Sequence, residues 1–466
     1  MSSLPLGLSS GPSVDRLVLL GAAATFAALL VVALRRSTRA ALGLWLAVAC
    51  FVPCWMSVKV QFDFPPTSAI GLVVLAAAVP FAVTRLHWVD WLLLSFVGLV
   101  VLALLMRAGS LAGAFAVLAQ WAVGYLVGRI LPSKVGLTWT YRCITVLFAV
   151  VAALALVEFL LSWNPFVSLS RGNAAYELWG QLQERGGIVR AEGAFGHSIA
   201  LGACLAMAVP VALASDLRPP LRVSIAVLLV AATVVTFSRT AIGCALLGLV
   251  LMLLLDRSGA LPTRARLGLI GCLVVAAVAL QSRILGVFSA AGDEATNSAA
   301  YRLDLLGLLP DVSLLGESPS VTRSPTGDVY VGAFHSIDSA WLLLGLTYGA
   351  LALGLVTVVY AGAALAVLAR RATAPTIAVV AQGPALVTVA LITQYATVFW
   401  FFAGLAVTAQ LAARPATGEK SAERRLEHEP QLDSSGSAVV AGTGTSDRRQ
   451  GDRAHIARRI ELRAPR

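Results

Sequence analysis

The chain has 466 residues, of which 58% are hydrophobic and 13% are charged, and its formal net charge is +11. Its mean hydropathy of +0.83 lies well above the values of soluble domains. This composition argues against a soluble multidomain protein, and it predicts an all-α polytopic membrane protein.

A membrane-spanning helix needs about twenty mainly apolar residues. By that criterion the sequence predicts twelve to thirteen spans. The basic cluster Arg35 to Arg39 follows the first apolar run instead of preceding it, so we expect this run to be a span and not a cleavable signal peptide. The thirteen apolar runs lie at 17–34, 40–58, 68–84, 88–106, 110–131, 143–161, 197–215, 221–237, 239–255, 265–281, 338–366, 377–392 and 395–412.

The distribution of Lys and Arg predicts the orientation, because loops inside the cell carry an excess of positive charge. With the N-terminus outside, fourteen of these residues fall in inner connections, eleven in the tail and ten on the outer side. We therefore expect a multi-pass protein of the plasma membrane with both long loops outside and a cytoplasmic tail. Positive-inside topology explains the basic balance, so no nucleic-acid partner is expected.

The spans and loops divide the chain into six parts. The loop at 282–337 has no apolar core evident in its sequence, and loops of this length are usually functional or disordered. Tyr301, Leu305, Leu308 and Leu309 recur at helical spacing, so this loop should be partly helical. The parts are N-terminal spans (1–161), a first outer loop (162–196), further spans (197–281), a large outer loop carrying the chemistry (282–337), C-terminal spans (338–412) and a disordered cytoplasmic tail (413–466).

The cysteines and histidines do not predict a metal site. All six cysteines fall inside apolar runs, where they are expected to be small buried hydrophobic residues. No Cys/His cluster has the spacing of metal ligands, and we expect neither disulfides nor a metal.

Arg239 lies in a short outer connection, Thr236 to Thr240, between two nearly uncharged spans. An Arg at mid-bilayer costs about 2.5–3.5 kcal/mol on insertion scales. The side chain either snorkels to the outer headgroups or faces a ligand. Its position on the side poor in positive charge favours a side chain that faces a ligand.

Four groups of residues follow one another between Arg190 and Leu355. They are Arg190-x-x-Gly193-x-Phe195-x-His197, Phe237-Ser238-Arg239, Tyr301-Arg302 leading through Pro310 to Leu315-Gly316, and Phe334-His335-Ser336 before the apolar run Trp341–Leu355 with Gly345, Gly349 and Gly354. This ordered set resembles the O-antigen ligase and polysaccharide polymerase superfamily of bacterial envelope glycosyltransferases. The set covers roughly residues 162–412. The sequence departs from the family at Gly316-Glu317-Ser318, where relatives tend to carry a second glycine, and in having one more N-terminal span than the usual twelve.

The resemblance implies transfer of a glycan from a polyprenyl diphosphate to a glycan or lipid acceptor, without metal or cofactor. Arg190, Arg239 and Arg302 match the family's diphosphate-binding positions, and guanidinium groups suit phosphate oxygens. His335 matches the histidine to which ligase relatives assign the general base, a role that an imidazole fits near neutral pH. The alternative for His335 is a histidine at a helix start or at the membrane interface.

Three further residues have both a functional and a structural explanation. His197 either binds sugar or phosphate or opens a span at headgroup level. Asp338 either orients the His335 imidazole or is an acid favoured at a helix N-terminus. Tyr301 stands beside Arg302 as a possible sugar or supporting contact.

Three functions remain open. A polymerase of an exopolysaccharide, capsule or O-antigen-like polymer and an O-antigen-type ligase share the same chemistry. A transporter or flippase of lipid-linked glycans would place ionisable residues at mid-span, often in broken helices. In this sequence the polar residues gather in the outer loops, which favours the enzyme.

Overall fold

The computed structural model describes most of the chain before residue 414. The predicted span at 265–281 lies mostly outside the described residues, as do the first part of the large loop and the tail. The described residues are 14–59, 62–78, 85–170, 172–185, 187–255, 263–264, 266–268, 270–271, 301, 304–323, 329–334 and 336–413.

The described part of the chain is almost entirely helical, which confirms the all-α class. Its strands form only three short antiparallel hairpins: β1 (Val58–Lys59) with β2 (Asp63–Phe64), β3 (Glu184–Arg185) with β4 (Ile188–Val189), and β5 (Val321–Arg323) with β6 (Val329–Val331). The α-helices are α1 (Val14–Arg35), α2 (Thr38–Phe51), α3 (Pro66–Ala78), α4 (Trp88–Leu105), α5 (Leu111–Phe115), α6 (Ala122–Val135), α7 (Leu137–Leu161), α8 (Ala174–Trp179), α9 (Ser198–Ala214), α10 (Pro219–Val234), α11 (Arg239–Leu255), α14 (Ala340–Tyr348), α15 (Ala350–Leu368), α16 (Ala374–Val380), α17 (Gly383–Thr388) and α18 (Thr393–Ala413). A π-helical turn, η2 (Ala116–Trp121), joins α5 to α6, and 3₁₀ turns occur at η3 (Gly193–Phe195) and η4 (Leu306–Asp311).

The helices have the length and surface of a membrane protein. Among the described residues, five helical runs are long and apolar enough to cross a bilayer: α4, the continuous run Leu111–Val135, α7, α15 and α18. Seven shorter apolar runs accompany them. Large apolar side chains such as Leu94, Leu160 and Leu365 are exposed along these helices, as expected where lipid is the solvent. The exact number of spans and the sides on which the loops lie stay predictions.

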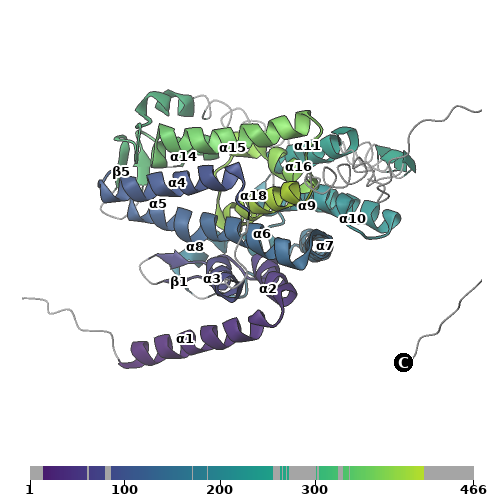
Figure 1. Cartoon of the computed structure of the whole chain (residues 1–466), viewed down its shortest axis with the longest axis horizontal. Helices are drawn as coiled ribbons and strands as arrows, with labels where there is room; N and C mark the ends of the chain where they lie inside the picture. The colour runs from purple at the N-terminus through teal and green to yellow at the C-terminus, as the bar shows by residue number, and fades with distance from the viewer. Residues whose placement is uncertain are drawn as a thin grey trace, which may run out of the picture. The chain divides into compact units, whose positions relative to one another are not determined.

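Two helices, α9 and α18, form the centre of the described bundle, and Figure 1 shows them surrounded by other helices. Nearly every residue of α9 is buried, and so is most of α18. Helix α18 packs most closely on α6 through glycines. A Cβ atom at Gly128 would lie 2.0 Å from the Phe401 carbonyl oxygen, and one at Gly404 would lie 2.1 Å from the Tyr125 carbonyl oxygen. Small residues allow such backbone approach between membrane helices.

The apolar runs at 338–366 and 377–392 are not single spans, which corrects the prediction. The first is α14 followed by α15, with a break at Gly349, where φ is +91°. The second is α16 followed by α17, with a break at Ala381 and Gln382. Hydropathy gave no sign of either break, because the broken runs stay apolar throughout.

The break between α14 and α15 is closed by backbone from the large loop. The Ala350 and Leu351 amides donate to the Ser313 and Leu314 carbonyls at 2.8 and 3.2 Å, and the Gly316 amide donates to the Tyr348 carbonyl at 3.1 Å. Polar backbone groups freed by a helix break in a membrane must find partners inside the protein. Here the loop itself supplies them.

The close approach at Gly316 needs a glycine. Its φ is +82°, and a Cβ atom there would lie 2.2 Å from the Ala108 carbonyl oxygen. Gly316 therefore makes a tight contact with Ala108, in the segment that follows α4.

The large loop has a small core of its own, contrary to expectation. Leu305, Leu308 and Val331 are buried with Leu342 and Leu346 of α14. The helical expectation for 301–309 is borne out at Leu305 and Leu308, which point into this core. Leu309 does not join them, since 53% of its surface is exposed.

Candidate functional site

The loop at 162–196 is fixed to the end of α7 by Glu158. Its carboxylate accepts the backbone amides of Glu192 and Gly193 at 3.0 and 2.9 Å, and the Asn164 amide group at 2.9 Å. Asn164 also donates to the Gly193 carbonyl at 3.1 Å. A buried carboxylate with three donors is well satisfied, so Glu158 holds the Arg190–His197 motif in place. The sequence placed this acid near a span end and gave it no role.

Arg190 joins this loop to the connection that precedes α11. Its side chain is 9% exposed. Its Nε donates to the Thr236 carbonyl at 2.8 Å, and a terminal nitrogen lies 3.5 Å from the Gln183 amide oxygen. Arg185 donates to the next carbonyl, that of Phe237, at 3.0 Å. Two arginines of the first loop thus hold the turn that leads into Arg239.

Arg239 is exposed and begins α11, and the hydroxyl of Ser238 caps that helix by accepting the Ala241 amide at 3.2 Å. A cation at this end is unfavourable for the helix dipole, whereas an anion there is favoured. The placement therefore fits a ligand-facing Arg better than a residue chosen for helix stability.

The start of α11, at Arg239, and the start of α14, just after Asp338, are each joined by a hydrogen bond to the end of α17. The Thr240 and Thr388 hydroxyls lie 3.2 Å apart, and the Ala340 amide donates to the Val389 carbonyl at 3.0 Å. Arg239, Asp338 and the Arg190 loop, which lie far apart in the sequence, therefore meet around the end of α17.

The residues on either side of His335 contact Tyr301. The Tyr301 hydroxyl donates to the Ser336 carbonyl, and its ring meets the Phe334 ring edge-on with centroids 5.4 Å apart. The Ser336 hydroxyl lies 3.3 Å from a carboxylate oxygen of Asp338. His335 and Arg302 themselves lie outside the described residues, so their roles stay predictions.

Asp338 lines a cavity close to these residues. It is about 530 Å³ and lies between η4, α14 and α17. Leu305, Leu309 and Leu353 give it apolar walls, while Asp338, Ser339 and Thr388 place polar groups in its lining. An apolar cavity with a few polar groups is the usual form of a small-molecule site.

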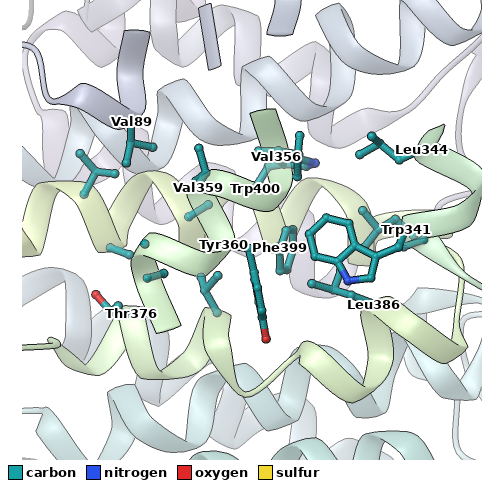
Figure 2. Close-up of a pocket in the computed structure, with 18 of the residues that line it drawn as sticks. Val89, Trp341, Leu344, Val356, Val359, Tyr360, Thr376, Leu386, Phe399 and Trp400 are labelled. Atoms are coloured by element: carbon teal, nitrogen blue, oxygen red, sulfur yellow. The ribbon is translucent and has the colours of Figure 1, made fainter. Parts of the chain in front are cut away.

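A second cavity of about 80 Å³ adjoins it, since Trp341 lines both. Figure 2 shows this cavity with Trp341, Tyr360, Phe399 and Trp400 around it. None of the described residues that line it is charged. The Tyr360 hydroxyl donates a hydrogen bond to the Val380 carbonyl at 2.7 Å. It can hold an apolar chain, but it offers no group for chemistry.

The Arg190 loop also contains two buried ionisable groups whose pKa values are displaced. Burial, together with the neighbouring Glu158 carboxylate, raises the pKa of Glu192 to about 7. Burial and the charge of Arg190 lower the pKa of His197 to about 4. Near neutral pH His197 is therefore uncharged, and Glu192 is poised between its two forms.

His197 is positioned as the N-cap of α9. Its Nδ1 accepts the Ile199 amide at 3.1 Å, so in the neutral ring the proton is on Nε2. The cap explains why a histidine opens this helix. A sugar- or phosphate-binding role for His197 stays a prediction.

Sequence reasoning identified Arg190 and His197 but missed Glu192 between them. Its only signal was an acid inside an otherwise apolar and basic motif. Its chemistry depends on burial against Glu158, which belongs to another element.

The described residues contain no group of three or more His, Cys, Asp or Glu side chains that could hold a metal ion. The five cysteines among them are free. The metal-independent reaction implied by the resemblance stays a prediction.

Comparison of the sequence with protein-family models and with curated proteins finds no match to either.

Proposed function

We propose that the protein is a membrane glycosyltransferase that transfers a glycan from a polyprenyl diphosphate to an acceptor, most simply as the polymerase of an exopolysaccharide, capsule or O-antigen-like polymer. The observation that carries the proposal is that hydrogen bonds of neighbouring residues bring the segments that carry Arg190, Arg239 and Asp338 together around the end of α17. The sequence places Arg302 and His335 in the loop that packs on this same region.

In this proposal the exposed Arg239 guanidinium and the start of α11 attract the diphosphate of the donor. Fixed cations stabilise the charge that develops on the leaving diphosphate. Arg302 adds a second guanidinium, and Arg190 holds the turn before Arg239. The apolar cavities that share Trp341 suit the polyprenyl chain.

The acceptor hydroxyl loses its proton to His335, which acts as general base. Its oxygen attacks the anomeric carbon as the bond from that carbon to the diphosphate oxygen breaks, and the electron pair leaves with the diphosphate. Asp338, three residues further along the chain, is suited to orient the imidazole. No metal takes part. An O-antigen-type ligase would use the same residues with a lipid or protein acceptor.

The broken helices favour one other candidate, a transporter of lipid-linked glycans, because discontinuous helices are common at transporter substrate sites. In this chain, however, the groups freed between α14 and α15 bind the backbone of residues 313–316. That break provides the backbone groups that bind the large loop, which favours the enzyme over the transporter.

The two candidates differ in whether they need a sealed membrane. Purified protein in detergent, given a polyprenyl-diphosphate glycan, should release polyprenyl diphosphate and form longer glycans. If the protein does not lengthen the glycan in detergent, yet moves the lipid-linked glycan across the membrane of liposomes, it is the transporter.

A further inference from the structure

A separate polar cavity of about 280 Å³ lies where five segments meet, one of which is the π-helical turn η2. Its walls come from the chain after α2, the start of α3, helix α8 and the start of α18; Figure 1 shows β1, α3 and α8 as neighbours. It is distinct from the Asp338 cavity, with which it shares no residue. The polar side chains that line it are Ser57, Asp63, Thr67, Gln120, Trp179, Thr393, Gln394 and Thr397.

Gln394 lines this cavity and carries a buried acceptor without a hydrogen-bond partner. The residue is 3% exposed. Both of its amide hydrogens are used, since Nε2 donates to the Val52 and Ala194 carbonyls at 3.0 and 2.9 Å. These bonds fix the amide orientation, and they leave Oε1 buried with no hydrogen bond. A buried polar atom of this kind calls for an explanation, and a ligand hydroxyl would satisfy it.

The neighbouring Thr393 shows the same feature. Its hydroxyl is buried without a hydrogen bond, and its φ of +47° is unusual for a β-branched residue. Strained backbone of this kind concentrates at ligand sites. The start of α18 thus offers two adjacent unsatisfied groups to one cavity.

Gln120 reaches the cavity from the π-helical turn η2, inside the run Leu111–Val135. Short π-helical segments within α-helices occur frequently at functional sites. The extra residue in this turn changes the direction of the side chains that follow it. The cavity therefore coincides with the irregular part of an otherwise regular spanning helix.

The remaining lining suits a neutral sugar. Trp179 offers an aromatic surface, and Asp63 offers a carboxylate near the Ser57 hydroxyl at 3.4 Å. Hydroxyl groups can bind carboxylate and amide oxygens, while the C–H face of a sugar ring packs on an aromatic side chain. Among the described residues that line the cavity none is Lys or Arg, so it is not built for a diphosphate. The Asp63 carboxylate also repels an acidic sugar.

The cavity borders the Arg190–His197 motif. The Trp179 and His197 rings lie 6.1 Å apart in an edge-on arrangement, and Gln394 binds the Ala194 carbonyl within the motif. Its outer wall is held in place, because the Asn173 amide group donates to the Trp55 carbonyl at 2.9 Å. A ligand here would contact the same loop that holds the turn before Arg239.

We infer that this cavity is a subsite for a neutral, uncharged sugar residue of the glycan substrate, with Trp179 as its stacking surface and Asp63, Gln120, Thr393 and Gln394 as hydrogen-bonding groups. The assignment of that sugar to a transferred glycan rests on the proposed function. Sugar binding itself needs no turnover.

The test measures sugar binding by the full-length protein in a detergent without a sugar headgroup. The probes are methyl glycosides of glucose, galactose and mannose, each paired with its uronic acid, titrated by calorimetry. We expect at least one neutral glycoside to bind, and its uronic acid to bind at least about tenfold more weakly. Trp179→Ala should weaken binding about tenfold, the size expected for an aromatic anchor. Trp163→Ala is the matched control, because Trp163 belongs to the same loop, is exposed and does not line the cavity.

Asp63→Asn gives an independent variant, since Asp63 is exposed and its replacement should not disturb folding. This variant should reduce the difference in affinity between the neutral glycoside and its uronic acid. The inference is overturned if no neutral glycoside binds the wild type, if Trp179→Ala and Trp163→Ala bind alike, or if Asp63→Asn leaves the sugar preference unchanged.

The outcomes also separate this subsite from the proposed function. A protein that binds the neutral sugar through Trp179 but extends no glycan would keep the subsite and refute the glycosyltransferase. If the wild type, Trp179→Ala and Trp163→Ala all extend glycans with the same KM, the glycosyltransferase is kept and the subsite is refuted.

Discussion

At the scale of single residues, the Arg190–His197 motif combines an uncharged histidine and a carboxyl group that titrates near neutrality. Glu192 is 2% exposed, and its raised pKa means that the folded protein favours the protonated form. Between its ordinary value of 4.5 and about 7, the folded state binds more protons than the unfolded state, so this group's contribution to stability falls as pH rises. His197 acts oppositely, because its pKa is lowered from 6.5 to about 4 and stability is lost as pH falls through that range.

Replacing Glu192 should expose this linkage. Glu192→Gln keeps an oxygen for the Gln183 amide, which Glu192 accepts at 2.9 Å, but it cannot ionise. Above pH 7 the variant should be more stable than the wild type, by up to about 3 kcal/mol for a shift of this size, and near pH 4.5 the difference should vanish. Thermal unfolding in detergent at pH 5 and pH 8 checks this.

Glu177→Gln serves as the control, since Glu177 is exposed on the same loop. If the Glu192→Gln and wild-type proteins keep the same stability difference at both pH values, Glu192 does not titrate in this range.

The arginines of the site should separate into a structural and a ligand-binding residue. Arg190→Ala removes the donor of the buried Thr236 carbonyl, so it should destabilise the fold by about 1–3 kcal/mol. Arg239→Ala changes an exposed side chain and should alter stability by less than about 0.5 kcal/mol. It should still reduce glycan transfer, by about 10- to 100-fold for the loss of a charged hydrogen bond.

Unfolding curves and transfer rates measured on the same preparations test this division. Normal transfer by Arg239→Ala at full expression would identify Arg239 as a residue anchored at the headgroups and not as a ligand contact.

The sequence was informative about Arg190 and Arg239, because both fall on the predicted outer side, where few positive charges are expected and a cation indicates a function. It was silent about Glu158, Glu192 and Gln394. Their properties come from burial between elements distant in the sequence, and no local pattern records that.

At the scale of elements, the closest packing in the bundle is between α6 and α18. Gly124 and Gly128 are four residues apart on α6, and each faces backbone of α18 where a Cβ atom would lie within 2.5 Å of a carbonyl oxygen. Backbone cannot yield as a flexible side chain can, so added volume must push the helices apart.

Gly128→Ala should therefore destabilise the protein by about 1–3 kcal/mol, the usual cost of overpacking. Gly98→Ala on α4 is a suitable control, because a Cβ atom there meets nothing within 4 Å, and alanine is the better helix former. Thermal unfolding of the two variants in one detergent gives the comparison. Equal melting temperatures would show that the α6–α18 contact is looser than described.

The sequence predicted the apolar helices well, since apolar length alone identifies them. It did not predict the breaks at Gly349 and at Ala381 and Gln382. A break depends on which backbone groups find other partners, and for Gly349 these lie in residues 313–316, earlier in the chain. Hydropathy does not carry that information.

At the scale of the whole molecule, the composition was enough to predict a helical membrane protein. It could not show that α9 and α18 would be the buried centre, because these two helices and the more exposed ones are all apolar. Burial in a bundle depends on packing partners, and lipid is as apolar as the protein interior.

The Lys and Arg distribution predicts that both long loops lie outside the cell and the tail inside. Ser320→Cys in a cysteine-free background should react with a membrane-impermeant maleimide in intact cells, since position 320 belongs to the large loop. A cysteine introduced at Ser435 in the tail should react only after permeabilisation. Labelling of position 320 only after permeabilisation would reverse the orientation.

The proposed glycan transfer depends on His335, which the large loop supplies as the base. The most direct measurement compares product length and donor affinity for wild type and His335→Ala, using purified protein and a polyprenyl-diphosphate glycan. A positioned base contributes a factor of about 10²–10⁴, so the variant should bind the donor as the wild type does, through the arginines, while extending glycans at least about 100-fold more slowly. Extension by His335→Ala at the wild-type rate would show that the base is another group, and no extension by the wild type would show that the protein is not this glycosyltransferase.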